Sequence, residues 1–238
     1  MTNIPPFDFG IICQSETELI AVLTCLEEGP RYNFRPPAAD NNTYCFGWIG
    51  SHHVVIAHLI EESAIEAAIV ATNLRYLGIE RCLYIGQAQS LSIHLHPGDV
   101  LIATEHYEYK LGIRTPLPLR MRKHLTDFKV STNLEASTSV LLDKIQDLDT
   151  KKKYIRPENA KINVVMDSIG YSPIDNPDTT LIEMWKKNKP LAFNSISAGI
   201  ARAGINFLMV FAISGLKPEG NTSLLAVKIG MDLLKSIP

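Results

Sequence analysis

The chain has 238 residues, 46% of them hydrophobic, and a formal net charge of -2. This size supports one large domain, or two tightly fused halves, with an ample buried core. The balanced charge argues against a nucleic-acid partner or a membrane-surface partner. We therefore expect residues 1–238 to form one domain or two fused halves, without a nucleic-acid or membrane partner.

The amino-terminal segment lacks the basic start and apolar core of a signal peptide, and no apolar run approaches the roughly 20 residues that span a bilayer. A cytoplasmic protein is the resulting expectation. The cysteines lie far apart, without the Cys-x-x-Cys spacing of a metal site: Cys13, Cys25, Cys45 and Cys82. They are typical of reduced core thiols rather than of a disulfide framework.

The chain opens with a strand followed by a helix. Residues 7–13 are a short β-rich run, and residues 15–26 have apolar positions at helical spacing. Ser15 can cap this helix, with Glu18 completing a capping box three residues later. Alternatively, Glu18 lies close to the carboxyl end of a strand, where a general acid would be useful. The sequence leaves both roles open.

A predicted hairpin occupies residues 43–57, with its turn at Gly50-Ser51. His52 and His53 follow the turn, but adjacent side chains on a strand point to opposite faces, which disfavours a shared metal. The Ala-rich residues 63–77 predict a helix.

Residues 81–86 predict a buried strand, followed by a loop from Gly86 to Ser92. A phosphate-binding loop usually has several glycines, so that backbone N–H groups can converge on the anion. This loop has one. The amides of Gln87 and Gln89 suit an uncharged polar ligand better than phosphate.

A polar cluster follows the next predicted strand, residues 100–103, and comprises His106, Tyr107, Glu108 and Tyr109. An imidazole, a carboxylate and two phenols could transfer protons or bind an organic ligand, or could form a polar strand end. His94 and His96 lie upstream, without the further ligands that a metal site needs.

The remaining segments alternate between strands and helices. We predict helices at 136–148, 179–187 and 223–237, strands at 161–166 and 207–214, a loop at 167–177 that contains Tyr171, and a small-residue helix opening within 191–203. This alternation indicates an α/β sheet covered on both faces. Ser214 then ends a strand at the edge where open α/β sheets usually bind ligands.

Several blocks, in the right order, resemble the purine and uridine phosphorylase family, which includes the methylthioadenosine/adenosylhomocysteine nucleosidases. These blocks are residues 7–18, 42–57, 83–86 and 97–103, and they are most similar to fungal nucleoside-phosphorylase-like domains. The resemblance implies a single-domain nucleoside-phosphorylase-like α/β fold. Its central sheet would be mixed, twisted, partly barrel-like and flanked by helices, and the protein would be a homo-oligomer without a cofactor.

The family's functional positions have changed in this chain. Glu18 matches the carboxylate that handles water in the nucleosidases, but Gly86–Ser90 replaces the glycine-rich phosphate loop. Ser195-Ile196 replaces the Met-Glu pair that binds the ribose hydroxyls. Phe211 stands where the family has an arginine, and Gly215 where it has the aspartate that protonates the purine. Losing a general acid alone costs about 10²–10⁴ in rate, so ordinary phosphorolysis is not expected.

Two hypotheses follow. In the first, the pocket has become the active site for an apolar metabolite, by cyclisation, isomerisation or elimination in fungal specialised metabolism. Proton transfer would involve Glu18, His106, Glu108 and Tyr171. Polar contacts would come from Gln87, Gln89, Tyr107, Asn194 and Ser214, and apolar walls from Phe193, Ile196 and Phe211. In the second, the chain is a non-catalytic small-molecule binder or partner subunit. Residual nucleoside hydrolysis is a third alternative.

Overall fold

A computed structural model describes residues 6–28, 41–92, 94–108, 164–171, 191–214 and 220–237, the side chains of 104–108, 164–171, 220–222 and 236 excepted. The strands are β1 (Phe9–Cys13), β2 (Thr43–Ile49), β3 (His52–His58), β4 (Arg81–Ser90), β5 (Val100–Glu108), β6 (Val164–Tyr171), β7 (Ala192–Phe193) and β8 (Asn206–Ser214). The helices within these ranges are α1 (Glu16–Leu23), α2 (Ala64–Tyr76), α6 (Ser197–Ala203) and α7 (Gly220–Ser236).

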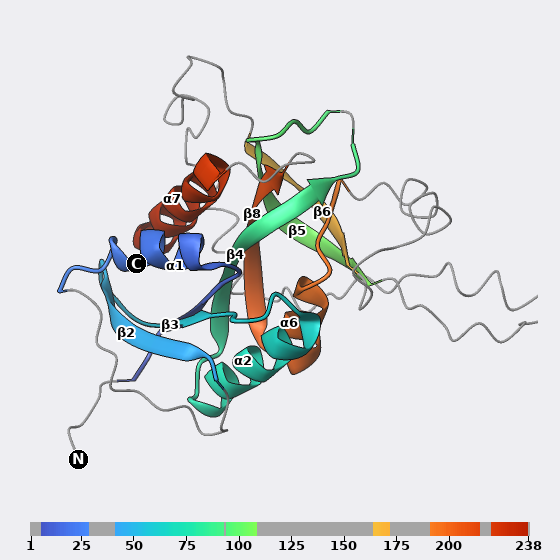
Figure 1. Ribbon diagram of the computed structural model, residues 1–238. Coiled ribbons are helices and arrows are strands. Elements are labelled where there is room, and N and C mark those ends of the chain that lie inside the picture. The colour runs from blue at the N-terminus through green and yellow to red at the C-terminus, as the bar shows by residue number, and fades with distance from the viewer. Residues whose placement is uncertain are drawn as a thin grey trace, which may run out of the picture.

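The strands form one mixed sheet in the order β2-β3-β1-β4-β7-β6-β5-β8, and β4 pairs with β8 as well. This additional pairing closes the part of the sheet from β4 to β8 into a barrel, whereas β2, β3 and β1 extend from it as an open sheet (Figure 1). The predicted α/β fold with a mixed, partly barrel-like sheet is confirmed.

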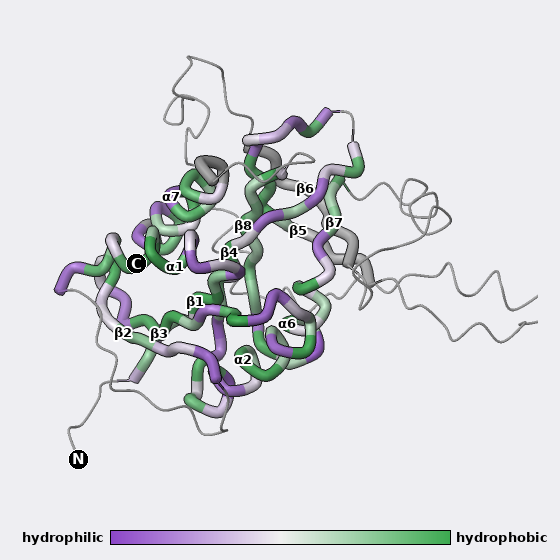
Figure 2. Tube along the Cα trace, viewed as in Figure 1, coloured by the Kyte–Doolittle hydropathy of each residue, from purple (hydrophilic) through white to green (hydrophobic). Residues whose placement is uncertain are grey.

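Two helical layers cover the sheet. Phe9, Ile11 and Cys13 of β1 pack in the core beneath α1 and α7, while Ile12 packs in a second core beside α2. This alternation is the period of two that a strand imposes when both of its faces are buried. Figure 1 shows α1 and α7 together on one side of the sheet and α2 and α6 on the other, and Figure 2 shows hydrophobic residues along β1.

Local sequence signals account for the elements nearest the site. The hairpin β2-β3 turns at Gly50, whose φ is +60°, and Ser63 caps α2 by accepting a hydrogen bond from the Glu66 backbone N–H. The predicted capping box of Ser15 and Glu18 is present at α1. The predicted turn and the predicted capping box rest on residues a few positions apart, and both are confirmed. The Ser63 cap adds to the predicted helix.

Three segments differ from the predicted boundaries. Gly86–Ser90 is not a loop but the end of β4, because the pairing with β8 continues from Arg81 to Gln89. The segment of His106 to Glu108 belongs to β5 rather than following it, and Tyr171 ends β6 rather than lying in a loop. In each case pairing with a distant strand extends the element. The predicted helices at 136–148 and 179–187 lie outside the described residues.

The four cysteines are free. Burial raises the pKa of the Cys45 thiol to about 11, which keeps the thiol protonated and unreactive at neutral pH. Cys13, Cys45 and Cys82 are core residues as predicted, whereas Cys25 is only half-buried. No described helix is both long and apolar enough to cross a bilayer.

Helices α2 and α6 approach each other at small residues. A Cβ atom at Gly199 would lie 1.8 Å from the carbonyl oxygen of Ala64 and 2.8 Å from the backbone nitrogen of Ala68. The contact is therefore backbone against backbone, and a side chain at Gly199 has no room. Because α6 begins just after Asn194, this contact helps fix one wall of the candidate site.

We predict that Gly199→Ala lowers the free energy of unfolding by about 3 kcal/mol or more, since the two helix backbones must separate to admit the methyl group. Urea unfolding measures the effect. Gly230→Ala in α7 is the control: its Cβ would meet only the side chains of Ile85 and Leu83, at 3.2 Å, so its change should stay within about 1 kcal/mol. Equal stability of Gly199→Ala and the wild type would contradict the close contact.

Candidate functional site

An open cleft of about 330 Å³ lies where several strands end. Its lining consists of Gln14, Glu62, Gln87, Phe193, Asn194, Ser195, Ile196 and Ser214. Gln14 directly follows β1, and Ser214 is the last residue of β8. The cleft thus occupies the strand-end position at which α/β sheets commonly bind ligands.

The side-chain carbonyl of Gln14 is the centre of a hydrogen-bond network in this cleft. Its Oε1 accepts from the Tyr84 hydroxyl at 2.9 Å, the Gln87 backbone N–H at 3.1 Å and the Asn194 side-chain amide at 3.1 Å. A Cβ at Gly86 would lie 2.3 Å from the same oxygen. Gln14 therefore ties β1, β4 and the segment before α6 together, and a side chain at position 86 would displace it from this network.

Asn194 is a structural residue of the cleft wall. Its Nδ2 also donates to the Gln87 carbonyl oxygen at 2.7 Å, and its Oδ1 accepts from the Ser197 backbone N–H at 2.8 Å. The Ser197 hydroxyl donates to the Asn194 carbonyl at 2.8 Å. Both amide hydrogens of Asn194 have protein acceptors, so this predicted ligand contact is engaged within the protein.

The two predicted glutamine contacts differ in position. Gln87 lines the cleft, but its Nε2 donates to the Ser223 hydroxyl of α7 at 2.8 Å. Gln89 is exposed, and it is not among the residues that line the cleft. The amide donors predicted for an uncharged polar ligand are thus largely directed elsewhere.

Two carboxylates lie near the phenol of Tyr84. Glu62, on the exposed segment before α2, accepts a hydrogen bond from Gln14 Nε2 at 2.8 Å. Burial raises the pKa of the Tyr84 phenol well above its ordinary value; a hydrogen bond with Asn194 opposes this, and the charges of Glu18 and Glu62 raise it further. Tyr84 therefore stays protonated and serves as a donor to Gln14.

Glu18 is fully buried in the first turn of α1. Its Oε2 accepts from the Ser15 backbone N–H at 2.8 Å and from the Ser15 hydroxyl. Its Oε1 is buried and has no hydrogen-bond partner within the described ranges. The helix cap therefore uses one oxygen of Glu18 and leaves the other without a partner, and Glu18 is not among the residues that line the cleft.

The predicted apolar walls are only partly in the cleft. Phe193 and Ile196 line it. Phe211 is fully buried in the core, where its ring meets that of Tyr84 edge to face at 5.5 Å between centroids, and it does not line the cleft. Phe211 lies in the core beside α2, whereas Ser214, the last residue of β8, lines the cleft.

The predicted proton-transfer cluster occupies neighbouring positions in the sheet. His106 pairs with Ile169, Tyr107 with Gly170 and Glu108 with Tyr171, and Gly170 pairs in turn with Phe193 of the cleft. The backbone register thus places these segments one and two strands from β7. Their side chains lie outside the described part of the structure.

Comparison with known proteins identifies the fold. No protein-family model matches the chain, and neither does any curated protein. Among solved structures, futalosine hydrolase of Helicobacter pylori superposes with a TM-score of 0.71 at 13% identity, covering 99% of this chain and 100% of the hydrolase. The 5'-methylthioadenosine/S-adenosylhomocysteine nucleosidase of Neisseria meningitidis gives a TM-score of 0.70 at 15% identity, covering 97% and 99%. The chain has the nucleosidase fold.

A third nucleosidase, from Campylobacter jejuni, superposes with a TM-score of 0.68 at 16% identity, over 97% of this chain and 100% of the enzyme. Identities this low establish the fold and not the activity. The predicted resemblance is thereby confirmed for the nucleosidase fold, and function must be argued from the cleft itself.

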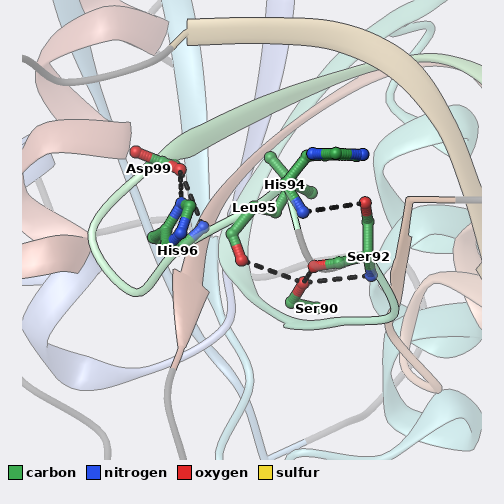
Figure 3. A network of polar contacts seen from close by, with 6 residues as sticks. All are labelled: Ser90, Ser92, His94, Leu95, His96 and Asp99. Atoms are coloured by element: carbon green, nitrogen blue, oxygen red, sulfur yellow. Dashed lines mark hydrogen bonds and ion pairs between the residues drawn. The ribbon is translucent and has the colours of Figure 1, made fainter.

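A second polar network lies in the turn between β4 and β5 (Figure 3). The Ser90 hydroxyl donates to the Ser92 carbonyl at 2.7 Å, and the His96 backbone N–H donates to the buried carboxylate of Asp99 at 2.8 Å. These contacts shape the turn.

Among the described residues, no group of three histidine, cysteine or acidic side chains is placed to hold a metal.

Sequence reasoning missed Gln14, Glu62 and Ser195 as members of the cleft. The signal available was position: Gln14 directly follows a buried strand, and Glu62 precedes the N-cap of α2. Both lie at strand-to-helix connections, which is where α/β sheets commonly bind their ligands.

We predict that Gln14→Ala destabilises the protein by about 1–3 kcal/mol, because it removes the acceptor of the buried Tyr84 hydroxyl and of the Asn194 amide. Thermal or urea unfolding measures the loss. Gln89→Ala is the matched control, since Gln89 is exposed, and it should change stability by less than about 0.5 kcal/mol. Equal effects of the two substitutions would contradict the central role of Gln14.

Proposed function

We propose that the chain is an enzyme that transforms a small organic molecule in this cleft by proton transfer, and that it performs neither phosphorolysis nor nucleoside cleavage. The reaction class is isomerisation, cyclisation or elimination. Glu18 is the proposed proton-transferring group, and the substrate has an apolar body that meets Phe193 and Ile196.

The observation that carries this proposal is the unpartnered Oε1 of the buried Glu18. A buried polar atom without a partner costs about 1–3 kcal/mol, and more when it belongs to a charged group. The helix cap does not require that cost, because glutamine serves equally well at the third position of a capping box. We attribute the carboxylate in this position to acid-base chemistry, because catalytic acids and bases are often buried.

The chemistry of the cleft argues against phosphorolysis. A phosphate site needs converging backbone N–H groups. Here the N–H of Gln87 already donates to Gln14, and Gly86–Ser90 is a paired strand. Ile196 offers no acceptor to ribose hydroxyls at the position where the resembling family has glutamate. An apolar ligand surface fits that substitution better than a sugar does.

We predict that Glu18→Gln slows turnover by about 10²–10⁴, because glutamine cannot transfer a proton. Wild type and variant would be incubated with a fungal metabolite extract, and mass spectrometry would follow the compounds consumed. Thermal unfolding should show Glu18→Gln as stable as the wild type or more so, since the cap survives and the buried charge is gone. Glu16→Gln, an exposed change on the same helix, is the control and should behave as wild type.

The same measurement separates the enzyme from a non-catalytic binder. Native mass spectrometry after incubation with the extract detects a retained ligand. A binder would retain the same compound in the wild type and in Glu18→Gln, with no compound consumed by either. That outcome, or a large loss of stability in Glu18→Gln, would contradict the proposed role of Glu18.

A further inference from the structure

We infer that Glu62 makes the cleft selective for an organic cation, an amine carried on an apolar body. This inference deepens the proposed function and rests on it, because it names the substrate class of the same cleft.

The position of the Glu62 carboxylate is fixed by its neighbour. Its Oε2 accepts from Gln14 Nε2 at 2.8 Å, and Gln14 is itself held by its three donors. The other oxygen, Oε1, has no hydrogen-bond partner within the described part of the chain. One oxygen is thus anchored, and the second remains to accept a hydrogen bond from a ligand.

The charge of the cleft is one-sided. Glu62 is the sole ionisable side chain among the described residues that line it, and the others carry amide, hydroxyl, aromatic or aliphatic groups. Both hydrogens of the Asn194 amide are bound by protein acceptors, so this residue adds little attraction for an anion. A cationic head near Glu62 and an apolar body against Phe193 and Ile196 match this lining.

The preference for an amine comes from its charge. A hydrogen bond between an ammonium group and a carboxylate is stronger than one between neutral groups. Because Glu62 is solvent-exposed, screening reduces its contribution, and a preference for the amine of about 2- to 5-fold is the expected size. A neutral alcohol could also donate to Oε1, but without the charge.

The test compares three probes that share one apolar body: phenethylamine, 2-phenylethanol and 3-phenylpropionate. Ligand-observed NMR at low ionic strength gives their dissociation constants for the wild type, Glu62→Gln and Glu61→Gln. Glu61 is the matched control, because it is adjacent, exposed and outside the cleft lining, and its substitution removes the same charge. Thermal unfolding of each variant checks that the fold is intact.

We expect the wild type and Glu61→Gln to bind phenethylamine about 2- to 5-fold more tightly than 2-phenylethanol, and 3-phenylpropionate most weakly. In Glu62→Gln the preference for the amine should disappear, while 2-phenylethanol binds as before. Equal binding of amine and alcohol by the wild type, equal losses in both variants, or no binding of the amine would each overturn the inference.

The binding test of Glu62 and the turnover test of Glu18 can fail separately. Turnover that depends on Glu18 without any preference for the amine would leave the enzyme in place and reject the role of Glu62. A preference for the amine that depends on Glu62, without any turnover, would support the role of Glu62 and reject the proposed catalysis by Glu18.

Discussion

The candidate site depends on one acceptor, the side-chain carbonyl of Gln14. Three donors converge on it, from the Tyr84 phenol, the Gln87 backbone and the Asn194 amide. Because these groups come from β4 and from the segment before α6, the oxygen fixes how two parts of the fold meet. The same side chain donates to Glu62, and it occupies the space that a side chain at position 86 would need.

This arrangement supports the proposal that a nucleosidase fold here holds a cleft for a substrate other than a nucleoside. Backbone and amide donors that could have faced a ligand are engaged in holding the wall. What remains toward the cleft is the Glu62 carboxylate and the hydroxyl-bearing Ser195 and Ser214, together with the aromatic and aliphatic side chains of Phe193 and Ile196. The buried Glu18 lies close enough to Tyr84 for its charge to act on that phenol, which connects the helix cap to the cleft.

Much of the fold follows from short-range sequence signals, whereas the extents of the barrel strands do not. The β2-β3 hairpin, the helix α2 and the capping box of α1 each depend on neighbouring residues, and the sequence predicts all three. The ends of β4 and β5 depend on pairing with β8 and β6, which are distant in the chain, so local patterns place them too early.

The site was harder to predict than the fold, because family resemblance directs attention to positions where the family's motifs lie. Ser214, Phe193 and Ile196 do line the cleft, but Gln14 and Glu62 belong to no motif. The donors of Asn194 could not be known to be engaged without the position of Gln14. Phe211 illustrates the remaining difficulty, since both faces of β8 are buried along most of its length and only its last residue, Ser214, lines the cleft.

The central claim is that this cleft no longer serves nucleoside cleavage. The most direct measurement is release of free adenine from 5'-methylthioadenosine by the purified protein, followed by chromatography, with an active nucleosidase as the positive control. The account predicts no release above the rate without protein, because no carboxylate stands at position 196 to bind the ribose. Release of adenine in proportion to protein concentration would contradict it.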